Sequence, residues 1–122
     1  MQNYSKRRIF WYLYLNTHFL SHHIADMTTK KYTITQYTRD QAKRLGVTIK
    51  HSQNPLKKLD VFDKNCDKIA SCGAMGYNDY PTFMKKMGKE IADKHRVQYK
   101  RRHEKDRHVV GSPGYYADQL LW

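Results

Sequence analysis

The chain has 122 residues, which allows one small domain and excludes a multidomain protein. Ten tyrosines, four phenylalanines and two tryptophans argue against a disordered chain, which would be poor in aromatic residues. Lysine and arginine number 23 against 11 aspartates and glutamates, so the net charge of +12 predicts a polyanionic partner: nucleic acid, an anionic membrane face or an acidic protein surface.

The first 26 residues combine a basic start with a short apolar run at Ile9–Leu15. This run is shorter than the roughly 20 apolar residues that span a bilayer, and no small-residue cleavage site follows it. Met27 opens a second, ordinary start, so we interpret residues 1–26 as an upstream extension. The alternatives are a signal peptide and a membrane-surface anchor in which residues 9–20 contact the membrane.

Organised structure is predicted from Tyr37 onward, so we divide the chain into an N-terminal extension, poorly structured or helical, at residues 1–36 and a single domain at residues 37–122. Thr38 begins a capping-box pattern and Gly46 supplies a stop. These two signals predict a short helix over Arg39–Leu45.

Alternating apolar and polar residues follow this helix. The segment VTIKH at Val47–His51 predicts a half-buried strand. Leu59–Phe62 and Lys68–Ser71 predict a β-hairpin with a polar turn of four or five residues, and the alternation places Asp60 outward. Two cysteines, one in this turn and Cys72 after it, make no disulfide framework and favour a reducing compartment.

A long basic helix is predicted after Pro81, which suits the first turn of a helix. We expect about 25 residues of amphipathic helix, interrupted only by Gly88. The predicted inner face carries Met84, Met87, Ile91, His95 and Gln98, with Phe83 and Tyr99 flanking it. The predicted opposite face carries Lys85, Lys86, Lys89, Arg96 and Lys100.

The most basic segment runs from Lys94 to His108, with seven lysines and arginines against Glu104 and Asp106. Such a run neutralises phosphates and gives salt-sensitive affinity with little sequence preference. The alternative is an ordinary solvated helix face, but the charge imbalance is too large for internal pairing. The predicted nucleic-acid or polyanion site is Lys85, Lys86, Lys89, Arg96, Lys100, Arg101, Arg102, Lys105 and Arg107.

Several tyrosines stand beside these basic residues. Their rings have two possible roles: stacking on exposed bases, or packing at the rim of the core with the hydroxyl in water. We favour packing for this set, which is Tyr77, Tyr80, Tyr99, Tyr115 and Tyr116.

No catalytic pattern of the GxSxG, HExxH or P-loop kind is present. The cysteines and histidines have zinc-finger spacing at only one of three intervals, so we predict no metal, no cofactor, no catalytic residue and no small-molecule substrate. A small nuclease that holds Mg²⁺ through Asp60, Asp63 and Asp67 is the weaker alternative, because turns are rich in aspartate anyway.

The chain ends in an apolar tail after a turn at Gly111–Gly114. We predict that Tyr115–Leu121 forms one or two helical turns. Tyr116, Leu120 and Trp122 are expected to cover the open face of the hairpin beside Phe62. The alternative is that the tail fills a partner's pocket; under either reading the anchor residues are Tyr115, Tyr116, Leu120, Leu121 and Trp122.

The motifs YTRDQAKRLGV, KKLDVF, KIASCGAMGYNDYPT, YKRRHEKD and GSPGYYADQLLW together resemble a family of small basic proteins encoded by large double-stranded DNA viruses of algae and protists. The resemblance covers Tyr37 to Trp122 and implies a viral setting: the virion, or the cytoplasm, virus factory or nucleus of the infected cell, without secretion. It supplies no catalytic residues. Cys66 stands in the hairpin turn where the resemblance implies glycine.

These patterns predict an α+β fold: a short helix, an antiparallel sheet of two or three strands, one long basic helix, and an aromatic tail packed back. The predicted function is non-enzymatic binding of DNA or RNA, or of another polyanion, with possible association with the virion. The alternative is a minor capsid or cement protein whose basic helix meets acidic capsid surfaces.

Overall fold

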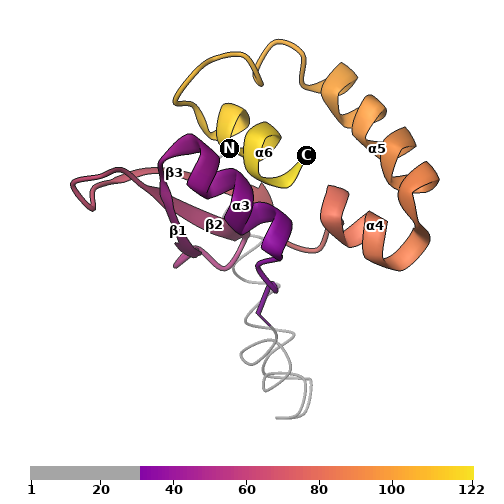
Figure 1. Ribbon diagram of the computed structural model, residues 1–122. Coiled ribbons are helices and arrows are strands. Elements are labelled where there is room, and N and C mark those ends of the chain that lie inside the picture. Colours follow the sequence, from indigo (N-terminus) through magenta and orange to yellow (C-terminus); the bar gives the residue numbers. More distant parts are fainter. Residues whose placement is uncertain (1–30) are drawn as a thin grey trace, which may run out of the picture. The chain divides into compact units, whose positions relative to one another are not determined.

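A three-stranded antiparallel sheet and four helices make up the part of the chain that this computed structural model describes, residues 31–122 (Figure 1). The predicted α+β class is confirmed. The predicted extension at residues 1–26 lies outside the described residues. The elements are α3 (Gln36–Leu45), β1 (Thr48–His51), β2 (Lys57–Phe62), β3 (Lys68–Ala74), α4 (Tyr80–Met87), α5 (Lys89–Arg102) and α6 (Pro113–Leu121).

Helix α3 begins three residues earlier than predicted. Its N-cap is Thr35, whose side-chain oxygen accepts a hydrogen bond from the backbone N–H of Thr38 at 3.3 Å. Thr38 is buried in the first turn, so it is not the cap that the sequence pattern indicated. The helix ends at Gly46 as predicted, in the left-handed conformation with φ 72°.

The sheet has the order β1-β2-β3, with β2 in the centre. The hairpin register pairs Leu59 with Cys72 and Val61 with Ala70, which places these four side chains on one face. Cys66 adopts a φ of 65° in the turn between β2 and β3, in the left-handed region that favours glycine.

Asp60 lies on the opposite face of the sheet, yet only 2 % of the residue is exposed. The hydroxyls of Ser52 and Ser71 donate to its carboxylate at 2.7 and 2.6 Å, and the Lys68 ammonium lies at 3.4 Å. The predicted alternation is therefore confirmed, because Asp60 lies on the face opposite Leu59 and Val61, but the side chain is buried there beneath Ser52, Ser71 and Lys68.

The core lies between the sheet and the helices α3 and α6. Leu59 and Val61 of the sheet pack with Leu120 and Leu121 of α6. The predicted return of the tail onto the hairpin is confirmed, but its neighbours are Leu59 and Val61 rather than Phe62. Tyr32 and Ile34, which the sequence analysis placed in the extension, also pack against this core.

The predicted long helix is two helices, α4 and α5, separated at Gly88. Gly88 has φ 88°, which ends the first helix and changes the phase of the second. A single periodicity read across both helices therefore misplaces side chains. Met87 is 56 % exposed and Gln98 is exposed, whereas Arg96 and Lys100 turn toward the rest of the domain.

Candidate nucleic-acid interface

Five cations of α4, α5 and the turn after α5 point into solvent. None of them pairs with an acidic side chain among residues 31–122. Lys89 is also exposed, but its ammonium lies 2.6 Å from the Asp93 carboxylate. We call the unpaired five the outer cations: Lys85, Lys86, Arg101, Arg102 and Lys105.

Three other cations of the predicted site contact side chains of the domain itself instead of pointing into solvent. The Arg96 guanidinium lies over the Tyr80 ring, 3.4 Å from its centroid, and its Nη2 donates to the Tyr37 hydroxyl at 3.1 Å. Lys100 and Arg107 approach the carboxylate of Asp118. These three residues tie α5 to the remainder of the domain, so they are not available to a ligand in the way that the outer cations are.

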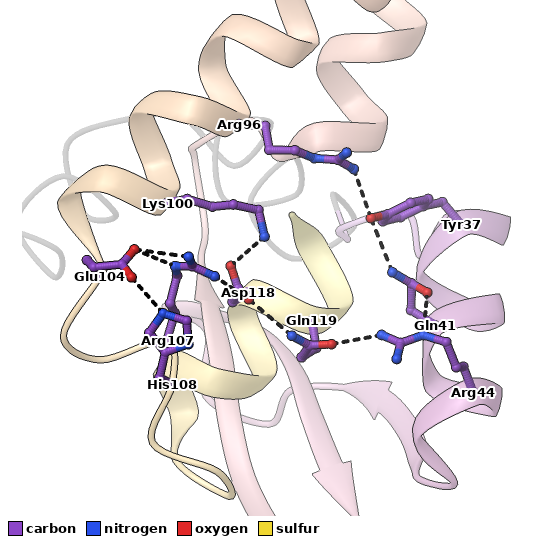
Figure 2. Close-up of polar contacts among 10 residues, drawn as sticks. All are labelled: Tyr37, Gln41, Arg44, Arg96, Lys100, Glu104, Arg107, His108, Asp118 and Gln119. Atoms are coloured by element: carbon purple, nitrogen blue, oxygen red, sulfur yellow. Dashed lines mark hydrogen bonds and ion pairs between the residues drawn. The ribbon is translucent and has the colours of Figure 1, made fainter.

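Asp118 is the acidic centre of this attachment (Figure 2). Its side chain is 1 % exposed, with the Lys100 ammonium 3.0 Å from Oδ1 and the Arg107 guanidinium 3.7 Å from Oδ2. The second side of the Arg107 guanidinium lies 3.0 Å from the Glu104 carboxylate. Asp118 therefore joins α6 to the end of α5 and to the loop that follows.

The same network continues to α3 (Figure 2). The Gln119 amide donates to Asp118 at 3.2 Å, and its oxygen accepts from the Arg44 guanidinium at 2.8 Å. Arg44 in turn donates to Gln41 at 3.1 Å, and Gln41 donates to the Tyr37 hydroxyl at 3.3 Å. The sequence patterns did not predict this network, although a charged Asp118 within the apolar segment YYADQLLW was a visible signal.

A row of aromatic rings lies between α4, α5 and the chain end. Phe83 stacks on His95 with centroids 3.9 Å apart, and Trp122 stacks on Tyr99 at 4.3 Å. Phe83 also meets Trp122 at 6.2 Å, and Tyr99 meets His103 at 4.3 Å. All five rings are half-buried, and we call them the ring column.

The predicted packing role of the tyrosines fits most positions. Tyr80 and Tyr116 are buried, and Tyr115 is half-buried in an edge-to-face contact with Tyr116. Burial raises the pKa of Tyr99 to about 12. Tyr77, in contrast, is 75 % exposed.

Arg96 Nε is buried without a hydrogen-bond partner, and the other buried polar side chains in the described residues are satisfied within the fold. Asp79 caps α4 and accepts from the Tyr32 hydroxyl, from the Lys58 ammonium at 3.1 Å and from Thr82. Burial raises the pKa of the Tyr32 phenol, with the hydrogen bond to Asp79 adding to the effect, and burial raises the pKa of the Cys72 thiol to about 12. The contacts of Asp79 with Lys58 and Tyr32 join the start of α4 to β2 and to the segment before α3.

The aspartates considered for a magnesium site do not form one cluster. Asp60 is engaged as described above, and the Asp63 carboxylate accepts from the backbone N–H groups of Asn65 and Asp67 within the hairpin turn. No group of three or more histidine, cysteine, aspartate or glutamate side chains between residues 31 and 122 could hold a metal ion.

Compared with known proteins, the chain matches no family model, no curated protein and no solved structure. No helix in the described part of the chain is both long enough and apolar enough to cross a membrane. The proposed membrane contact by residues 9–20 lies outside the described residues.

Proposed function

We propose that the protein binds nucleic acid, through the outer cations of α4 and α5, with little sequence preference. The observation that carries this proposal is the separation of two kinds of basic residue. Arg96, Lys100 and Arg107 satisfy internal partners, while the outer cations have no acidic partner in the described chain. Free lysine and arginine groups on one helical hairpin neutralise phosphates and release counterions.

The spacing of the outer cations suits an extended polyanion. Lys85 and Lys86 lie near the start of α5, and Arg101 and Arg102 lie at its end. A helix of 14 residues is about 20 Å long, a length over which one DNA strand presents about six phosphates. Contacts of this kind position a protein on the backbone without reading bases.

The capsid or cement alternative is less well supported. It relied in part on an aromatic tail that fills a neighbour's pocket. Tyr116, Leu120 and Leu121 instead lie in the chain's own core, and only Tyr115 and Trp122 are half-buried. The basic charge alone still suits an acidic protein surface, so polyglutamate serves as a competitor in the test below. The resemblance to viral proteins favours viral DNA or RNA as the natural partner.

Substitution of two outer cations tests this proposal. Arg101→Gln with Arg102→Gln should weaken binding to DNA by about tenfold or more at low salt, because two phosphate contacts are lost. Fluorescence anisotropy with labelled DNA measures this loss.

A matched control removes the same charge from another helix. Arg39 and Lys43 are exposed on α3 and pair with no acid in the described residues. Arg39→Gln with Lys43→Gln should therefore leave most of the affinity intact. Equal losses in the two double variants would show that binding follows net charge alone, and preferential competition by polyglutamate would favour the protein partner.

A further inference from the structure

The ring column has one end beside three outer cations. His95, Tyr99 and His103 follow one another at intervals of four residues, so they form a single stripe along α5. His103 is the C-cap residue of α5, half-buried, with one neighbour in the column, Tyr99. The column therefore ends on an imidazole at the surface.

Positive charge surrounds this end of the column. Arg101 and Arg102 precede His103, and Lys105 follows it by two residues. The charges of Asp118, Arg102 and Asp106 all act on the Tyr99 phenol, so this end of the column also has acidic neighbours. The adjacent Glu104 carboxylate lies 3.0 Å from the Arg107 guanidinium and 2.7 Å from the His108 ring, and these contacts offset part of its negative charge.

We propose that the surface prefers single-stranded nucleic acid, with a nucleobase stacking on His103 to extend the ring column. This inference rests on the proposed function. The neighbouring outer cations hold the phosphates on either side of the stacked base. A single strand offers unstacked base faces, whereas a duplex keeps its bases stacked inside the helix. Stacking of this kind tolerates any base, in agreement with binding that has little sequence preference.

The sharpest test compares two ligands of equal charge with the unmodified full chain. One is an oligothymidylate of about 20 nucleotides, and the other is an abasic phosphodiester of the same length. Base stacking predicts that the oligothymidylate binds about 5- to 100-fold more tightly. Equal affinity for the two ligands would overturn the inference but leave phosphate binding in place. Failure of both to bind would overturn the proposed function itself.

Two variants locate the stacking site. His103→Ala should reduce the affinity for oligothymidylate at least fivefold and leave the affinities for duplex DNA and for the abasic ligand unchanged. These two unchanged affinities also report that the variant is folded. Tyr77→Ala, which removes an exposed aromatic ring outside the column, should change none of the three. An unchanged affinity of His103→Ala for oligothymidylate, or an equal loss for all three ligands, would contradict stacking at His103.

Discussion

Asp60 is a single buried carboxylate whose surroundings favour its charged form. Burial by itself raises its pKa, but hydrogen bonds from Ser52, from Ser71 and from the Gln53 backbone N–H outweigh burial, and Lys68 adds to their effect. Together they lower the pKa to about 2 from an ordinary 3.8. The charged carboxylate of β2 thus links β3 to the loop that follows β1.

A depressed pKa makes stability depend on pH in one direction. The contribution of Asp60 is complete above about pH 4 and is lost as the pH falls toward 2. After allowance for solvent screening, this contribution is about 1–2 kcal/mol. The free energy of unfolding, measured with urea between pH 5 and pH 2, should fall by this amount more in the native chain than in an Asp60→Asn variant. Parallel curves for the two proteins would contradict the role given to Asp60.

Some single residues carried a correct signal in the sequence. Gly46 and Pro81 mark a helix end and a helix start, because each suits its backbone position for a local reason. Cys66 adopts the left-handed conformation at the position where the resemblance implied glycine. The prediction that Thr38 caps α3 was wrong, because Thr35 offers the same capping chemistry three residues earlier.

At the scale of elements, local alternation was enough to predict the strands of the sheet. The basic helix was harder, since Gly88 divides it and resets the positions of later side chains. Arg96 and Lys100 consequently face inward, although one continuous period placed them outward. The pairing of Lys100 with Asp118 spans 18 residues and depends on how α5 and α6 pack, which local patterns do not encode.

The Asp118 network attaches α5 to α6, and one substitution tests how much this network contributes to stability. Asp118→Asn should lower the free energy of unfolding by about 1–3 kcal/mol, because Lys100 and Arg107 lose their anionic partner while both remain partly accessible to water. Chemical denaturation measures this change.

Glu104→Gln is the matched control for this network. Its carboxylate also pairs with Arg107, but the side chain is 59 % exposed, so the expected loss is below about 1 kcal/mol. If the Glu104 variant lost as much stability as the Asp118 variant, the buried carboxylate would not be the main attachment.

For the whole molecule, the net charge of +12 indicated a class of partner but not a surface. The fold divides the basic residues into those that hold α5 in place and those that remain free. Under the proposed function, this division would let a chain of 122 residues use lysine and arginine both for stability and for binding nucleic acid. The apolar chain end belongs to the first purpose, since Leu120 and Leu121 complete the core.

The central claim is that the outer cations bind phosphates, and the salt dependence of DNA affinity tests it most directly. Affinity for a short DNA duplex, measured between about 50 and 200 mM salt, gives a slope of log affinity against log salt. Contacts by the five outer cations predict a slope of about −4.5, at roughly −0.9 for each phosphate neutralised. A slope near zero would contradict the claim, because binding would then release few counterions and the charge on α4 and α5 would not be what holds the DNA.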